Sequence, residues 1–250
     1  MYIDELDNYL MSLFDREKLL KFKDEWGFTY KDSKDVSLIG YATNLTPETV
    51  QGAIDKKVDL IITHHDAWDF VYGMKEKCMS MLRQHGISHY FNHLLLDDAD
   101  FGTNVSLMEK IGARIVEKSN LYQNDLFAGR IGEFETPLTF PELTARVENI
   151  LGERVKAWQN NSRIIKRLCV VTGGGSMTRD VKDAVDRNCD VYITGEKVLY
   201  TVQYAKFTGT NLIVGSHTYT EIFGVESLVN KLKENYDDLE VIRLSEERIE

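Results

Sequence analysis

A short run of β-branched residues and leucine, from Val58 to Thr63, places the strongest constraint on the fold of this chain. Such a nearly continuous apolar run is typical of a strand that is buried on both faces of a parallel sheet. Similar runs recur at residues 36–41, 87–91, 168–172, 191–194 and 212–214, and helical patterns lie between them. This alternation predicts an α/β fold with mostly parallel sheets that are covered by helices.

Capping residues mark the ends of several predicted helices. Asp15 is a break or cap within an amphipathic stretch, and Thr46 with Pro47 predicts an N-cap followed by proline at the first helical position. Gly86 is expected to end a helix in the left-handed conformation. The predicted helical stretches are residues 3–22, 47–56, 75–85, 104–111 and a segment that opens near Pro141.

The middle of the chain, around Leu126 to Phe134, is less regular than the segments on either side of it. We expect a change of lobe there. The prediction is an N-terminal α/β lobe over residues 1–125, which C-terminal residues could complete, and a C-terminal α/β lobe over residues 126–250.

Two segments of the chain repeat each other at a constant spacing of 131 residues. A second repeat, at a spacing of 124 residues, places His93 and Asp97 opposite His217 and Glu221. The repeats predict two similar β-α-β units whose strand ends surround one central cleft, and chance likeness of short α/β units is the alternative. The first repeat matches Ile39 with Val170, Val50 with Val181, Ala53 with Ala184, Asp55 with Asp186, Asp59 with Asp190, Ile62 with Ile193 and Thr63 with Thr194.

Charge and cysteine content narrow the classes of function. The formal net charge is −10, without a basic stripe, which argues against nucleic-acid binding and favours a small substrate. The three cysteines lack CxxC spacing, which argues against a disulfide framework and a thiolate zinc site. The start of the chain lacks a secretory signal, and no apolar run reaches the roughly 18 residues that a membrane span needs. We therefore expect a cytoplasmic protein that does not contact membranes.

His64 and His65 directly follow the strand predicted at residues 58–63, at the carboxyl end where open α/β sheets bind their ligands. Adjacent side chains on an extended backbone diverge, so each histidine would serve a different metal of a close pair. A lone His-His pair at a strand end would more often be structural, and other residues have to support the metal hypothesis.

His217 and Glu221 give that support, because they lie four residues apart at the expected start of a helix and share one helical face. Imidazole and carboxylate at this spacing form a common half-site for zinc, manganese or iron, although a solvated pair is the alternative. Asp97 adds a hard oxygen ligand after the strand at residues 87–91, with Asp98 as the competing choice. The prediction is a pair of divalent cations surrounded by three imidazoles and two carboxylates.

Further polar residues lie beside these candidates. His93 is either a ligand or a residue that orients Asp97 or a bound phosphate, and Glu196 is a candidate general base or substrate contact. The Gly173 to Ser176 segment lacks the lysine of a P-loop and is interpreted as a tight strand-to-helix turn. His85 and His89 are interpreted as structural.

Together these segments resemble the NIF-three-like family, also known as GTP cyclohydrolase I type 2 homologues. The resemblance covers most of the chain, and the joint order of its motifs is more specific than any one of them. The motifs are Ala42 to Pro47, Asp59 to His65, His93 to Asp97 with Gly102 and Asn104, Ile193 to Glu196, and Gly215 to Glu221 with Gly224.

The resemblance implies two similar α/β lobes, a dinuclear divalent-metal site in the cleft between them, and a ring-shaped hexamer built from dimers. It also implies that His65 and Asp97 hold one metal, that His64 and His217 hold the other, and that Glu221 bridges the two. The implied activity is like that of a GTP cyclohydrolase, with purine C8 as the attacked atom.

Two motifs depart from the usual pattern of the family. Asp66, Ala67 and Trp68 stand where proline and an aliphatic or aromatic pair are common, and Leu94 with Leu95 replaces a Thr-Asn pair. The five presumed ligands are retained, so the departure concerns the pocket wall and the identity of the substrate. Asp66 is a further candidate ligand or proton acceptor.

The leading hypothesis is metal-assisted hydrolysis of a nucleotide or a related small molecule, in which Glu196 or His93 moves protons. The alternative is a metal-binding regulatory or scaffold protein whose metals are structural. Five ligands for two cations leave room for water, which favours the enzyme.

Overall fold

The computed structural model describes residues 1–32, 35–123 and 126–250. The chain forms two compact units, of which the first contains Met1–Ala99 with Val225–Ile249 and the second contains Asp100–Gly224 with Glu250. This division differs from the predicted boundary at residue 125, which itself lies outside the described residues. The strands on either side of that point pair with each other inside the second unit.

Within the described residues, the first unit contains a five-stranded sheet with the order β1-β4-β3-β2-β11. Strand β1 is antiparallel to β4, and the other neighbours are parallel. The strands are β1 (Trp26–Tyr30), β2 (Leu38–Asn44), β3 (Leu60–His65), β4 (Ser88–Asn92) and β11 (Glu240–Arg243). The helices are α1 (Ile3–Ser12), α2 (Arg16–Lys21), α3 (Pro47–Asp55), α4 (Met74–His85), α5 (Leu94–Asp98) and the second half of α10 (His217–Asn235).

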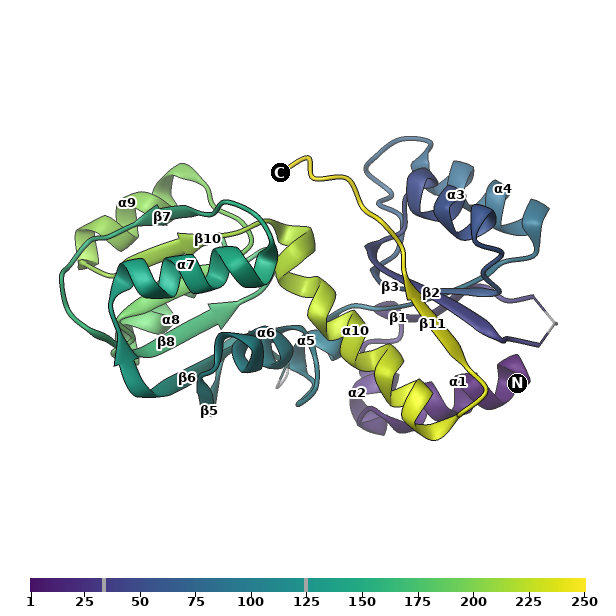
Figure 1. Cartoon of the computed structure of the whole chain (residues 1–250), viewed down its shortest axis with the longest axis horizontal. Helices are drawn as coiled ribbons and strands as arrows, with labels where there is room; N and C mark the ends of the chain where they lie inside the picture. The colour runs from purple at the N-terminus through teal and green to yellow at the C-terminus, as the bar shows by residue number, and fades with distance from the viewer. Residues whose placement is uncertain (33–34, 124–125) are drawn as a thin grey trace. The chain divides into compact units, whose positions relative to one another are not determined.

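Strand β3 is the predicted central strand, and all six of its residues are buried. Helices α3 and α4 cover one face of the sheet, where Val50 and Leu82 belong to the same buried cluster as Ile61 of β3. Figure 1 shows α1 and α2 on the opposite face. Coverage of both faces explains why β3 has an apolar run instead of an alternating pattern.

The capping predictions in this unit are confirmed. The side chain of Asp15 accepts a hydrogen bond from the backbone N–H of Lys18 at the start of α2. Thr46 and Thr49 form a capping box around Pro47 at the start of α3. Gly86 ends α4 with a φ of 59°, a conformation that glycine adopts without a Cβ clash.

The second unit contains a six-stranded sheet among its described residues, with the order β5-β6-β8-β9-β10-β7. Its strands are β5 (Arg114–Gln123), β6 (Leu126–Leu138), β7 (Lys156–Trp158), β8 (Ile165–Val171), β9 (Val191–Thr194) and β10 (Asn211–Val214). Its helices are α6 (Thr103–Ile111), α7 (Phe140–Leu151), α8 (Thr178–Asp186), α9 (Leu199–Thr208) and the first half of α10.

Alternate residues of β8 enter two different cores of the second unit. Leu168 and Val170 pack in the cluster that contains residues of α6 and α7, while Cys169 and Val171 pack in the cluster that contains residues of α8 and α9. Among the described strands, β8, β9 and β10 are parallel to one another, and the remaining pairings of this sheet are antiparallel. The prediction of mostly parallel sheets therefore holds for the first unit, whereas the second sheet is mixed.

The internal repeat corresponds to β2-α3-β3 in the first unit and β8-α8-β9 in the second. Helices α3 and α8 each have nine residues, and their starts lie 131 positions apart. Asp59 and Asp190 also have the same role, because each carboxylate accepts hydrogen bonds from two successive backbone N–H groups at the start of the preceding strand.

The gapless match is wrong in the first strand of the repeat. Ile39 lies opposite Leu60 in β3, and the residue in the matching place of the second unit is Leu168, opposite Val191. The predicted partner of Ile39 was Val170. The shift of two residues keeps each side chain on its face of the sheet, which is why the apolar pattern did not reveal it.

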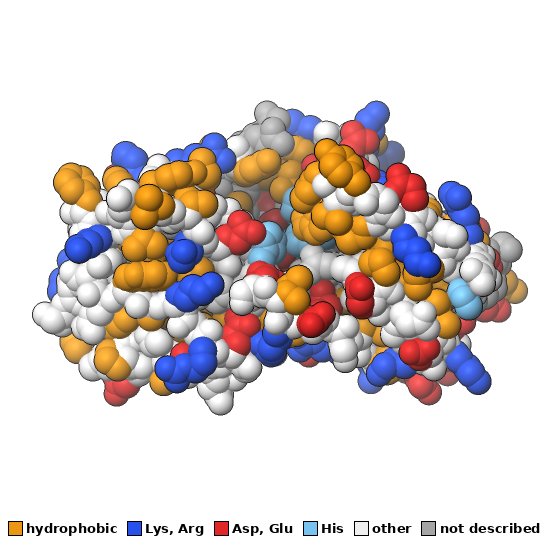
Figure 2. Space-filling model, turned by 90° about the horizontal axis from the view of Figure 1, so that it is seen from above, with side chains coloured by type: hydrophobic (Ala, Val, Ile, Leu, Met, Phe, Trp, Pro, Cys, Tyr) orange, Lys and Arg blue, Asp and Glu red, His pale blue; other side chains and the backbone are white. Residues whose placement is uncertain are grey.

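No helix in the described part of the chain is long and apolar enough to cross a membrane. Lys and Arg side chains are interspersed with Asp and Glu on the face drawn in Figure 2.

Candidate metal centre

Three histidines of the first unit lie together at the carboxyl ends of the neighbouring parallel strands β3 and β4. The ring centroids of His64 and His65 are 4.5 Å apart, and that of His93 is 5.1 Å from each. One nitrogen from each ring lies within 4.8 Å of the others, which is a spacing that could hold a metal ion. The side chains of His64 and His65 do not diverge as expected. Their spacing still allows each ring to bind a different cation of a close pair.

Each of these rings has its Nδ1 beside an oxygen acceptor. A backbone carbonyl or a carboxylate oxygen can only accept, so Nδ1 carries the proton and Nε2 is the nitrogen with a lone pair for a cation. The Nδ1 partners are the carbonyl oxygen of Asn92 at 2.9 Å for His64, Oδ1 of Asn44 at 2.8 Å for His65, and Oε2 of Glu25 at 2.7 Å for His93.

Asp97, rather than Asp98, belongs to this cluster. Oδ1 of Asp97 is 3.4 Å from Nε2 of His64, and the side chain is 14% exposed. Asp98 instead forms an ion pair with Lys18. The structure thus places Asp97 where the sequence predicted it, one helical turn after His93.

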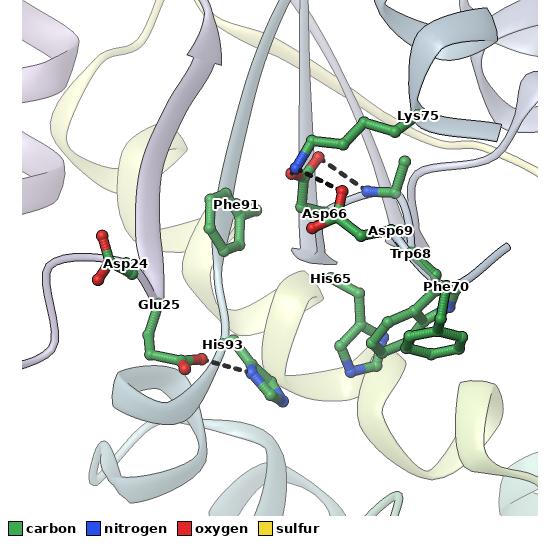
Figure 3. Close-up of a pocket in the computed structure, with 11 residues that line it drawn as sticks. Asp24, Glu25, His65, Asp66, Trp68, Asp69, Phe70, Lys75, Phe91 and His93 are labelled. Carbon is green, nitrogen blue, oxygen red and sulfur yellow. Dashed lines mark hydrogen bonds and ion pairs between the residues drawn. The ribbon is translucent and has the colours of Figure 1, made fainter. Parts of the chain in front are cut away.

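Glu25 is a site residue that the sequence analysis missed. It pairs with His93, as Figure 3 shows, and the hydrogen bond from His93 lowers the pKa of Glu25 even though burial opposes this shift. The antiparallel pairing of β1 with β4 sets Trp26 opposite Asn92 and so brings Glu25 to the end of β4. Because these two strands are far apart in the sequence, no local sequence pattern indicates that Glu25 lies beside His93.

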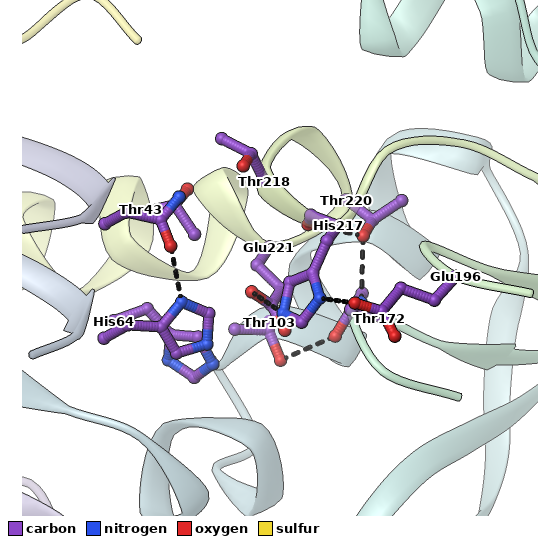
Figure 4. Close-up of polar contacts among 12 residues, drawn as sticks. Thr43, His64, Thr103, Thr172, Glu196, His217, Thr218, Thr220 and Glu221 are labelled. Carbon is purple, nitrogen blue, oxygen red and sulfur yellow. Dashed lines mark hydrogen bonds and ion pairs between the residues drawn. The ribbon is translucent and has the colours of Figure 1, made fainter. Parts of the chain in front are cut away.

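The second unit holds the other predicted ligands at the start of α10. Nε2 of His217 is 3.2 Å from Oε2 of Glu221, one helical turn away. Nδ1 of His217 is 2.7 Å from Oε1 of Glu196, so the ring lies between two carboxylates (Figure 4). Burial disfavours the charged ring, but Glu221 and Glu196 outweigh it and raise the pKa of His217 to about 11.

Glu196 therefore contacts a predicted ligand directly. The hydrogen bond from His217 lowers the pKa of Glu196, which keeps it a carboxylate. Carboxylates that hold the Nδ1 proton of a metal-binding histidine are common around metal sites. This geometry supports an orienting role for Glu196 beside the predicted role in proton transfer.

The glycine turn after β8 approaches this cluster closely. Gly173 has a φ of +60°, and a Cβ atom at this position would lie 1.8 Å from Oε1 of Glu221. The backbone N–H of Gly173 donates to Oγ1 of Thr220 at 3.0 Å, and its carbonyl accepts from Gly195. The segment is a tight turn, as predicted, and Gly173 leaves room for the carboxylate of Glu221.

The remaining candidates have other partners. Asp66 lies 3.0 Å from Nζ of Lys75, which gives this carboxylate a cation of the chain itself. His89 is fully buried between the hydroxyls of Thr29 and Thr63, and burial lowers its pKa to about 4. The structural interpretation of His89 agrees with this environment, and His85 is exposed at the end of α4.

The five predicted ligands thus fall into two groups, one in each unit. The first group contains His64, His65 and Asp97, and the second contains His217 and Glu221. Imidazole nitrogen and carboxylate oxygen are the donors that zinc, manganese and iron take in proteins. The donor types and the held Nδ1 protons of the first group therefore fit a divalent-metal site.

Comparisons with known proteins give a consistent picture. A model of the Duf34/NIF3 (NGG1p interacting factor 3) family matches residues 1–248. A protein of Pyrococcus horikoshii named GTP cyclohydrolase 1 type 2 homolog is 30% identical over 241 residues, which cover 89% of this chain and 94% of that protein. A Pasteurella multocida protein of the same name is 28% identical over 218 residues, covering 84% and 85% of the two chains.

Solved structures show the same fold. Protein ybgI, described as of unknown function, superposes with a TM-score of 0.86 at 23% identity and with 99% of both chains covered. Reduced HcgD from Methanocaldococcus jannaschii superposes with a TM-score of 0.82 at 24% identity and with 98% of both chains covered.

Proposed function

This chain belongs to the Duf34/NIF3 family, as its motifs predicted, and on this premise we propose that it is a hydrolase that uses two divalent cations. The proposed ligands are His64, His65, Asp97, His217 and Glu221. The proposed substrate is a nucleotide or a related small molecule, and the name shared by the curated relatives supports this class.

The observation that carries the proposal is the way in which the imidazoles are held. His64, His65 and His217 each have Nδ1 beside an oxygen, from a carbonyl, an amide or a carboxylate. Such contacts fix the ring and direct Nε2 away from the contact, as at established metal sites. In two of these rings Nε2 also lies close to another proposed ligand, Asp97 at 3.4 Å for His64 and Glu221 at 3.2 Å for His217.

The residues around the proposed ligands would supply orientation and proton transfer. When bound, the cations would provide a hydroxide nucleophile near neutral pH and neutralise charge that develops on the substrate. The Glu25 carboxylate fixes the proton on Nδ1 of His93, which leaves the partly exposed ring able to accept or release a proton at Nε2. Glu196 holds Nδ1 of His217 in the same way.

The test combines metal content with turnover. The purified wild-type chain should contain about two divalent cations and should hydrolyse GTP or one of a set of nucleotides and phosphoesters. The double variant His64→Ala, Glu221→Ala should lose both properties, because it removes one proposed ligand from each unit. The matched control is His85→Ala, Glu234→Ala, which removes an exposed histidine and an exposed glutamate and should behave like wild type.

Equal turnover by the double variant and the control would contradict catalysis at these residues. If the wild-type chain and the control bind cations but hydrolyse none of the compounds, the result favours the regulatory or scaffold function.

A further inference from the structure

A pocket in the first unit lies directly beside the histidine cluster. Its volume is about 280 Å³, and His65 and His93 form part of its lining (Figure 3). Residues 66–70, which follow β3, form another part of the wall.

Aromatic side chains form much of the pocket wall. The rings of Trp68 and Phe70 are stacked, with centroids 5.3 Å apart and an angle of 30° between their planes. The ring centroids of Trp68 and His65 are 4.5 Å apart, and Phe91 lines the pocket as well. Phe70 is 72% exposed although it is a large apolar side chain. An exposed aromatic ring at the wall of a pocket offers a face on which a planar ligand can stack.

The charged residues of the lining are mainly acidic. They are Asp24, Glu25, Asp66 and Asp69, against the single cation Lys75, which gives a formal charge of −3 with the histidines neutral. Nζ of Lys75 lies 3.0 Å from Asp66 and 3.1 Å from Asp69, so its charge is already shared between two carboxylates. A phosphate group in this pocket would meet repulsion, whereas the N–H groups of a ring would meet acceptors.

We infer that this pocket binds the ring of the substrate, as a planar nitrogen heterocycle that is uncharged or cationic and presents N–H groups to the carboxylates. Phosphate groups of a nucleotide are directed elsewhere. The inference rests on the proposed function for the statement that the bound ring belongs to the substrate. It also assigns Trp68 and Phe70 as residues that determine specificity, because stacking selects flat rings without selecting one base.

The test measures ligand binding to the full chain by isothermal titration calorimetry, both as purified and after treatment with EDTA. The probes are guanosine, 7-methylguanosine, whose ring is cationic, and inorganic phosphate. We expect both nucleosides to bind without metal, with 7-methylguanosine at least as tight as guanosine, and we expect no phosphate binding after EDTA treatment.

Two exposed phenylalanines provide a matched pair of variants. Phe70→Ala should weaken nucleoside binding at least about fivefold, since the loss of one stacked ring usually has this effect. Phe207→Ala is the control, because Phe207 is 85% exposed on α9 in the second unit. Both side chains are mostly in solvent, so neither change should unfold the protein.

Equal affinities of the two variants would overturn the inference, as would phosphate binding to the EDTA-treated chain at the affinity of guanosine. Nucleoside binding without turnover of any compound would support the ring site and remove the hydrolase function. Turnover of a substrate without detectable nucleoside binding would support the hydrolase function and overturn the ring site.

Discussion

At the scale of single residues, the environment of each histidine separates the candidate ligands from the structural one. His64 and His65 have one nitrogen held by an oxygen at the end of a strand, whereas His89 has both nitrogens beside threonine hydroxyls inside the core. The sequence distinguished these roles only through position along the predicted strands. Partners such as Asn44 and Glu25 could not be assigned, because their contacts depend on the pairing of strands.

Gly173 gives a prediction at this scale. Gly173→Ala should destabilise the fold and reduce the metal content, because its Cβ would collide with Glu221. Gly209→Ala is the matched control, since Gly209 has a similar φ of +69° but no atom within 4 Å of the added Cβ. The control should lose only the roughly 1–2 kcal/mol of a left-handed residue. Urea unfolding and elemental analysis measure both effects, and normal metal content in Gly173→Ala would contradict the proposed place of Glu221.

His89 gives a prediction about pH. An unfolded imidazole takes up a proton below its ordinary pKa of 6.5, whereas the pKa of folded His89 is about 4. Its contribution to stability is therefore complete above pH 6.5 and is lost as the pH falls to about 4. Between pH 7.5 and pH 5, the wild-type chain should lose about 2 kcal/mol more unfolding free energy than His89→Gln. His85→Gln should follow wild type, and identical pH profiles for all three proteins would refute the burial of a neutral His89.

At the scale of elements, local signals predicted helix ends and central strands well. The caps at Asp15, Thr46 and Gly86 depend on contacts between residues that are close in the sequence, so the sequence alone indicates them. Strands β1, β5, β6, β7 and β11 were not predicted, and the segment at Leu126 to Phe134, interpreted as less regular, is part of the 13-residue strand β6. Four of these strands lie at sheet edges, and β6 pairs antiparallel with β5 and β8, so none has the continuous apolar run of the buried parallel strands. The two-residue shift between β2 and β8 was also hidden, since a shift of two leaves the apolar pattern unchanged.

The segment after β11 gives a prediction at this scale. The carboxylate of Glu246 accepts hydrogen bonds from the backbone N–H groups of Thr43 and Asn44 and from the side-chain amide of Asn44. It thereby directs Oδ1 of Asn44 toward His65. Glu246→Ala should weaken metal binding by about tenfold, as loss of such orienting contacts commonly does. The exposed neighbour Glu247→Ala is the control, and a competition titration with a zinc chelator compares them; equal affinities would contradict the orienting role.

At the scale of the whole molecule, the fold class and the family were predictable from the sequence. The expectation that C-terminal residues could complete the first lobe agrees with the structure, whereas the predicted boundary between the lobes does not. Residues Val225–Ile249 belong to the first unit through β11, which pairs with β2, and helix α10 continues from one unit into the other. A chain that returns to its first sheet leaves no change of composition at the point of return.

The hexamer stays a prediction of the family resemblance. Light scattering coupled to size exclusion should give a mass of about 173 kDa, six times the 28.8 kDa chain. A mass near that of a single chain or of two chains would contradict it.

The most direct measurement of the central claim is anomalous X-ray diffraction from crystals loaded with zinc or manganese. We predict two anomalous peaks per chain, which mark two ions coordinated by His64, His65, Asp97, His217 and Glu221. The absence of such peaks would contradict the account. So would ions coordinated by other residues while these five side chains bind none.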